Sequence, residues 1–190
     1  MSITLHPVSD EPATASSWVR AMRDPVSAAE RLAVRFRERA IEGERLRTMP
    51  TDLVAQVRHA GLVTLALPRT LGSVELDPLT ILSIIEEDSY ADGSAGWTTM
   101  IGNSTSFLAW LDPVVAADFV ADGVPTMGSV FGPTGRAAPR DDAAFDVTGR
   151  WAFSSGRPHT EWFFDGAFVT DGSAPRMIDG NCACKRQGLR

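Results

Sequence analysis

Cysteine and lysine are almost absent from this 190-residue chain. Residues 1–181 contain neither residue type, and Cys182, Cys184 and Lys185 then occur within four residues of one another. A structural zinc site needs four ligands, and no further cysteine or nearby histidine completes a set, so we expect no metal site. A C-x-C metal or disulfide site is the alternative. The abrupt change in composition predicts that residues 177–190 form an atypical tail, such as the product of a frameshift, a truncation or an alternative end.

An excess of basic residues is also lacking. The formal net charge is −6 and the pI is about 5.0, so we expect neither nucleic acid nor an anionic membrane surface as a partner. No apolar run approaches the ~20 residues that span a bilayer. The first 16 residues lack the basic and apolar regions of a secretory signal, so residues 1–16 are interpreted as a loose lead-in and the location as cytoplasmic.

Helical periodicity dominates residues 17–123. A first helix is predicted from Trp18 to Leu46, where Leu32, Phe36 and Ala40 recur every four residues. A second helix is predicted from Pro50 to a stop at Gly61. Two Asp-Pro pairs, at residues 77–78 and 112–113, combine an N-cap side chain with proline at the first helical position. They predict the start of a third helix and of a short later helix. In the third helix, an apolar stripe of Leu79, Leu82 and Ile85 is joined by Ile81 and Ile84. A further helix is predicted between these two helices, with Trp97, Ile101, Ser104 and Leu108 along one face.

Strand periodicity replaces helical periodicity after Gly123. The candidate strands are PTMGSVF, AAFDVTGRWAF and EWFFDGAFV. The segment PRDDAA has the turn chemistry of a hairpin, and a turn is predicted at Asp171-Gly172-Ser173 after the third strand. In the second strand Phe145, Val147, Trp151 and Phe153 are expected on one face. Helices followed by strands predict an α+β fold, with a helical domain at residues 17–123 and a β domain at residues 124–176.

Familiar catalytic motifs are missing. GSVFGPTGR lacks the endings of a P-loop and of a dinucleotide-binding turn, and GSAG is not a nucleophile elbow. Glu86, Glu87 and Asp88 are adjacent on a predicted helix, so we interpret them as a solvated acidic face. His159 follows a serine-rich turn, where orienting a loop or simple exposure is favoured over acid–base chemistry. No catalytic residue is assigned.

The stretch WAFSSG combines an aromatic strand face with two hydroxyl side chains. Trp151 and Phe153 would form a flat apolar wall, and Ser154 and Ser155 would add hydrogen-bonding groups where the strand ends. Such a place suits a flavin ring, which is a large plate with polar atoms along one edge. Ser-Ser-Gly is also ordinary turn composition, and aromatic faces are ordinary core, so the residues alone leave both interpretations open.

Three segments resemble the acyl-CoA dehydrogenase superfamily in order and spacing: LVTLALPRTLGS, EEDSYADGSAGW and MGSVFGPTGRAAPRDDAAFDVTGRWAFSSG. The likeness covers about residues 20–176. It implies a helical domain followed by an incomplete middle β-barrel, and flavin (FAD or FMN) as the cofactor. GRWAFSSG is more similar to the reduced-flavin monooxygenase branch than to the dehydrogenases, whose T-E-P-x-x-G-S-D-like segment is replaced here by FGPTGRAAPRDD.

The resemblance also suggests roles for single residues. It implies that Ser154 contacts the flavin near its reactive nitrogen and that Ser129 and Trp97 line the same pocket. Thr105 stands where relatives often have a histidine directed at an aromatic substrate, which puts a phenolic substrate in doubt. The cofactor-binding candidates are therefore Ser129, Trp151, Phe153, Ser154 and Ser155, and the substrate-pocket candidates are Trp97 and Thr105.

The family continues beyond the region of likeness into the rest of the barrel and a helical bundle, so the chain is expected to be truncated. By resemblance, a small-molecule substrate, a separate flavin reductase and a homotetrameric full-length assembly are implied. Two alternatives stay open, an acyl-CoA dehydrogenase and a non-catalytic fragment.

Overall fold

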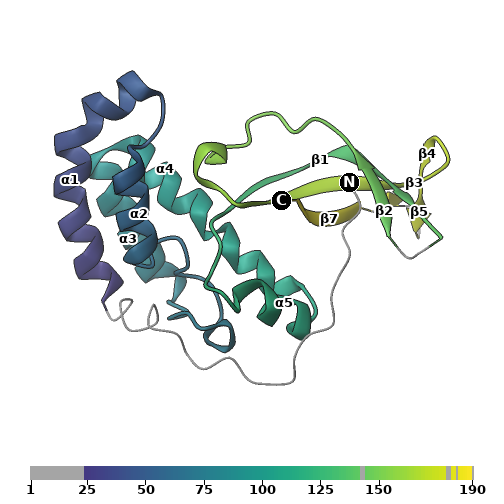
Figure 1. The fold of residues 1–190 in the computed structure, drawn as a ribbon, viewed down its shortest axis with the longest axis horizontal. Helices are drawn as coiled ribbons and strands as arrows, with labels where there is room; N and C mark the ends of the chain where they lie inside the picture. The colour runs from purple at the N-terminus through teal and green to yellow at the C-terminus, as the bar shows by residue number, and fades with distance from the viewer. Residues whose placement is uncertain (1–23, 142–143, 179–180, 183, 190) are drawn as a thin grey trace. The chain divides into compact units, whose positions relative to one another are not determined.

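The computed structural model describes residues 24–141, 144–178, 181–182 and 184–189, and it confirms the α+β fold (Figure 1). Helices fill the first part of the described chain and strands the second. The chain divides into two compact units, a helical unit up to Gly128 that also includes residues 155–161, and a sheet unit that contains residues 129–154 and the strands from Trp162 onward. The predicted lead-in at residues 1–16 lies outside the described residues.

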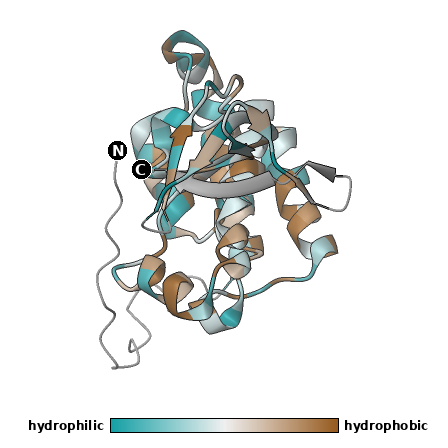
Figure 2. Ribbon diagram, turned by 90° about the vertical axis from the view of Figure 1, so that its right-hand side faces the viewer, coloured by the Kyte–Doolittle hydropathy of each residue, from teal (hydrophilic) through white to brown (hydrophobic). Residues whose placement is uncertain are grey.

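The helical unit consists of α-helices joined by short loops and 3-10 segments. Within the described residues up to Gly128, these elements are α1 (Pro25–Leu46), α2 (Thr51–His59), η2 (Arg69–Leu71), α3 (Pro78–Ala91), α4 (Gly93–Gly102), η3 (Asn103–Trp110) and α5 (Pro113–Val120). Each predicted helix has a counterpart, but the predicted helix that carries Trp97 to Leu108 ends as an α-helix at Gly102, and Ser104 and Leu108 lie in the 3-10 segment η3. Figure 2 shows hydrophobic and hydrophilic residues alternating along these helices, as expected for amphipathic elements.

The Asp-Pro pairs start helices as predicted. Asp77 accepts hydrogen bonds from the backbone N–H groups of Leu79 and Thr80 at 3.0 and 3.1 Å, and Asp112 accepts one from Val114 at 2.9 Å. Bonds of this kind satisfy N–H groups that the first helical turn leaves without intrahelical partners.

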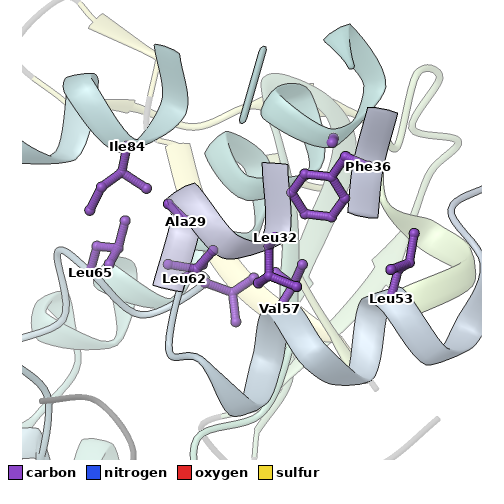
Figure 3. Close-up of a cluster of buried hydrophobic side chains, with 10 residues drawn as sticks. Ala29, Leu32, Phe36, Leu53, Val57, Leu62, Leu65 and Ile84 are labelled. Atoms are coloured by element: carbon purple, nitrogen blue, oxygen red, sulfur yellow. The ribbon is translucent and has the colours of Figure 1, made fainter. Parts of the chain in front are cut away.

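The core of the helical unit forms where α1, α2 and α3 meet residues 62–73, the connector that follows α2. Leu32 and Phe36 of α1 are buried with Leu53 and Val57 of α2 (Figure 3), as the apolar spacing predicted. The connector, α3 and α4 also contribute to the cluster, with Leu62, Val63, Leu65, Ile84 and Ala95.

Two predictions for α3 are wrong. Of the predicted apolar positions, Leu79 and Leu82 are 75% and 60% exposed, and only Ile84 is buried. Asp88, predicted to lie on a solvated acidic face, is 0% exposed. The apolar stripe and the buried face of α3 differ because α1 and α4 pack against the side of the helix that carries Asp88.

The described strands of the sheet unit do not close into a barrel. They are β1 (Met127–Pro139), β2 (Phe145–Thr148), β3 (Trp162–Asp171), β4 (Ala174–Pro175) and β7 (Cys184–Leu189), and β5 (Met177–Ile178) pairs separately with β6 (Asn181–Cys182). The order in the sheet is β2-β1-β3-β4, and β7 also pairs with β3. The pairs β1–β2, β3–β4 and β3–β7 are antiparallel. The predicted hairpin between β1 and β2 forms, with Pro139 opposite Phe145, and the predicted turn at residues 171–173 connects β3 to β4, with Asp171 opposite Ala174.

The predicted strand from Ala143 to Phe153 is too long. Phe145 and Val147 do alternate with more exposed neighbours, but β2 ends at Thr148. The chain then turns so that the Trp151 ring covers Gly135 and Gly149, where a Cβ atom at either glycine would overlap the ring. The Trp151 indole N–H donates to the carbonyl oxygen of Gly166 at 2.8 Å. This tertiary contact removes Trp151 and Phe153 from the strand.

Candidate functional site

Phe153 has the most unusual environment of the predicted site residues. Its backbone lies in the left-handed region, with φ of +60°, and its side chain is 96% exposed. A non-glycine residue in this region costs about 1–3 kcal/mol, and such residues are concentrated at functional sites. The Phe153 ring is therefore exposed on the sheet unit even though its backbone conformation is strained.

Ser154 follows Phe153 and is half-buried. Its hydroxyl donates to the carbonyl oxygen of Trp151 at 3.0 Å, so the serine oxygen keeps its lone pairs as hydrogen-bond acceptors. In the same unit Ser129 is buried in β1, at 7% exposed. The sheet unit thus carries four of the predicted cofactor-binding residues, three of them within residues 151–154.

A cleft of about 680 Å³ lies entirely within the helical unit. Ser155 and Gly156 line it together with Trp97 of α4, Arg47 at the end of α1 and the Thr48–His159 pair. Trp97 is 51% exposed, so its indole provides an accessible aromatic surface in a cleft with polar groups. Two predicted site residues, Trp97 and Ser155, therefore share one cavity.

His159 is anchored within this cleft. Its Nε2 atom lies 2.8 Å from the Thr48 hydroxyl oxygen. Partial burial lowers the pKa of the His159 imidazole below its ordinary value, which favours the neutral ring near pH 7. The sequence showed His159 beside the serine turn, but its partner Thr48 is 111 residues away and carried no local signal.

Arg39 also lines the cleft, but its guanidinium is already paired. It donates to Asp52 at 2.9 Å and to Glu42 at 2.8 Å. These charge-assisted hydrogen bonds lower the pKa of both carboxyl groups. Arg39 therefore joins α1 to α2 and has little capacity left for a ligand.

Thr105 lies apart from the cleft. It is 0% exposed, and its hydroxyl donates to the carbonyl oxygen of Val63 at 2.7 Å. Its assignment to the substrate pocket stays a prediction, and the observed contact gives Thr105 a structural role between η3 and the connector after α2.

Two buried carboxyl groups have raised pKa values. Burial raises the pKa of Asp88 to about 6, although its hydrogen bond from Thr99 acts in the opposite direction. Burial also raises the pKa of Asp165 in β3, which accepts the backbone N–H of Val130 at 2.9 Å. Across the described ranges, no group of three or more His, Cys, Asp or Glu residues is arranged to hold a metal ion.

Comparison with known proteins shows which enzymes the chain is related to. No protein-family profile matches it. It is 34% identical over 148 residues to indole-3-acetate monooxygenase of Pseudomonas putida, a match covering 77% of this chain and 36% of the relative. It is 31% identical over 140 residues to the flavin-dependent monooxygenase, oxygenase subunit HsaA, of Rhodococcus jostii, covering 72% of this chain and 36% of that protein.

The chain is homologous to flavin-dependent monooxygenases. Their fold is also the fold of this chain: the crystal structure of 3-HSA hydroxylase from Rhodococcus sp. RHA1 matches with a TM-score of 0.76 at 26% identity, covering 88% of this chain and 43% of the hydroxylase. These monooxygenases have the acyl-CoA dehydrogenase-like fold, so the predicted superfamily and branch are confirmed. The chain spans only about 36% of the length of the monooxygenases named above. Within the described residues, no helix has the length and apolarity of a membrane-spanning segment.

Proposed function

We propose that this chain carries the flavin-binding loop and part of the substrate cleft of a monooxygenase that uses reduced flavin. The proposal concerns a part of such an enzyme, because the chain covers little more than a third of the length of its relatives. We further propose a small-molecule substrate and a separate reductase that supplies reduced flavin, as the name "oxygenase subunit" of one relative suggests. A homotetrameric assembly like that implied by the resemblance belongs to the same proposal.

The observation that carries the proposal is the exposed, strained Phe153. An aromatic ring that is 96% exposed on a left-handed backbone gains little from burial in the core of the sheet unit. A planar aromatic ligand would bury this ring and so compensate for the backbone strain. This is the chemistry that a flavin ring offers.

The serine hydroxyl groups that follow Phe153 in the chain fit the polar edge of a flavin ring. The Ser154 oxygen can accept a hydrogen bond while its own proton is held by Trp151, and Ser155 adds a second hydroxyl one residue later. Ser129 and Trp151 are assigned supporting roles, since one is buried in β1 and the other is fixed by Gly166. No residue among these is positioned as a general acid or base, so we assign binding and orientation to them and leave proton transfer unassigned.

A bound reduced flavin would supply the electrons with which one oxygen atom of O₂ enters the substrate and the other leaves as water. The chain's own residues would hold the flavin edge through Phe153, Ser154 and Ser155. Trp97 would contribute an aromatic wall to the substrate cleft. We assign Thr105 no contact with the substrate, because its buried hydroxyl is bonded to the carbonyl oxygen of Val63.

Equilibrium dialysis of the purified chain against FMN and FAD tests this proposal. We expect weak binding, with a Kd of roughly 0.1–1 mM, because the chain offers only part of the contacts of its relatives. Ser154→Ala should weaken binding severalfold, whereas Ser83→Ala, which removes an exposed serine hydroxyl in α3, should leave it unchanged. Equal binding by wild type and Ser154→Ala, or no binding of either flavin at about 2–3 mM, would contradict the proposal.

A further inference from the structure

Residues 155–161 directly follow the proposed flavin-binding residues 151–154 in the chain, but they belong to the helical unit. It contains a short turn, η4 (Arg157–His159), and Gly156 with φ of +80°. None of its seven residues is buried. Apolar burial therefore contributes little to holding this segment in place, and specific polar contacts must do so.

A small cavity lies beneath this segment. Its volume is about 20 Å³, and Thr126, Gly156 and His159 are among the residues that line it. The Thr126 hydroxyl is buried and has no hydrogen-bond partner in the part of the chain that the structure describes. The volume is close to that of a single water site. Packing between the segment and the helices is thus incomplete.

Three polar contacts tie the segment to the helical unit. These are three among the contacts of the described residues, and they join the segment to the rest of the helical unit. In the first, the backbone N–H of Glu161 donates to the carbonyl oxygen of Thr126 at 2.9 Å. The second is the Arg58–Glu161 ion pair of 2.8 Å, in which both side chains are more than 40% exposed. Exposed ion pairs contribute little to stability. The third contact is the partly buried Thr48–His159 hydrogen bond of 2.8 Å, which joins the segment to the loop between α1 and α2.

We propose that His159, through its hydrogen bond to Thr48, is a positioning residue that holds the segment 155–161 on the helical unit and so fixes Ser155 in the cleft. It touches neither flavin nor substrate in this role. The contribution of Ser155 to flavin binding rests on the proposed function, whereas the anchoring of the segment does not.

Hydrogen exchange tests the anchoring on the chain as it is, without any flavin. The amide of His159 donates to Gly156 at 2.8 Å and that of Glu161 to Thr126 at 2.9 Å, so both report on the segment. In Thr48→Val and His159→Ala these amides should exchange about 5–10-fold faster, the effect of losing roughly one hydrogen bond. Thr48→Ser, which keeps the hydroxyl, should restore slow exchange, and His59→Ala, at an exposed histidine of α2, is the matched control. Unchanged exchange in α1 and α3 would show that each variant is folded.

The same variants in the FMN dialysis separate the two proposals. Faster exchange together with weaker FMN binding in Thr48→Val, both reversed in Thr48→Ser, supports the positioning role. Unchanged exchange in Thr48→Val overturns it, whatever happens to FMN. Faster exchange with unaltered FMN binding, in a chain where Ser154→Ala does weaken binding, overturns the link to Ser155 but leaves the proposed function standing. If the wild type binds no FMN, the proposed function fails and the exchange rates still decide the anchoring.

Discussion

The carboxylate of Asp88 in α3 accepts a 2.6 Å hydrogen bond from the hydroxyl of Thr99 in α4, and both side chains are 0% exposed. Only one carboxylate oxygen is bonded in this way. The other, Oδ1, has no hydrogen-bond partner within the described residues. An ionised carboxylate is costly in such a place, so burial raises the pKa of Asp88 to about 6.

Asp88 should make the stability of the helical unit depend on pH. Its folded-state pKa of about 6 lies above the ordinary value of 3.8, so the folded state binds the proton more tightly than the unfolded state does. Stability should therefore be lost as the pH rises from about 4 through 6, by roughly 3 kcal/mol in all. Urea unfolding at pH 4.5 and pH 8 measures this change.

Asp88→Asn provides the reference for this measurement, because asparagine can accept the Thr99 hydrogen bond without ionising. Other carboxyl groups, such as Asp52 and Asp77, have lowered pKa values and lose their stabilising effect as the pH falls. Their effect is the same in both proteins, so it cancels when the two stability curves are subtracted. The wild type should lose about 2–3 kcal/mol relative to Asp88→Asn between pH 4.5 and pH 8. Parallel stability curves for the two proteins would show that Asp88 does not titrate in this range.

Gly135 should be intolerant of a side chain. A Cβ atom at this position would overlap the Trp151 ring, whereas one at Gly132 in the same strand would meet nothing within 4 Å. Gly135→Ala should lower the free energy of unfolding by about 1–3 kcal/mol, since overpacking forces the indole to move. Gly132→Ala is the matched control and should change it by about 0.5 kcal/mol or less. Equal effects of the two substitutions in urea unfolding would contradict the observed placement of Trp151.

Phe153 should show a conflict between stability and binding. Phe153→Gly relieves the left-handed strain and removes a ring that is 96% exposed, so stability should be unchanged or rise by about 1 kcal/mol. FMN binding should nevertheless weaken severalfold. Tyr90→Ala, which removes another exposed aromatic residue from a helix, should affect neither. A clear loss of stability in Phe153→Gly would mean that the ring serves the fold and not a ligand.

The chain should not retain flavin through purification. The sheet is not closed among the described residues, and Phe131 is 52% exposed on β1, so we expect low solubility or weak flavin affinity. Absorbance at the flavin maximum after size-exclusion chromatography measures this. A stable yellow protein with one flavin per chain would contradict the expectation.

Local features of the fold were predictable from the sequence. The Asp-Pro pairs predicted helix starts because the N-cap bond involves residues two or three positions apart. Alternation between Phe145 and Thr148 predicted β2, and Gly172 predicted the turn after β3. The superfamily was predictable as well, because its motifs occur in the same order and at similar spacing in this chain.

Tertiary contacts were the features that the sequence could not reveal. The strand pattern continued to Phe153, but the hydrogen bond from Trp151 to Gly166 ends it earlier. Asp88 resembled its solvated neighbours because its partner Thr99 lies in the next helix. The Thr48–His159 pair joins residues too distant in the chain for any periodicity to connect them.

A ¹H–¹⁵N NMR titration of the chain with FMN tests directly whether residues 151–155 bind flavin, because it detects millimolar binding and locates it by residue. We expect progressive shifts of the backbone amides of Phe153, Ser154 and Ser155 and of the Trp151 indole N–H. The exposed α3 amides near Leu79 should not move. Shifts confined to other regions, or no shifts in residues 151–156 at saturating FMN, would contradict the account.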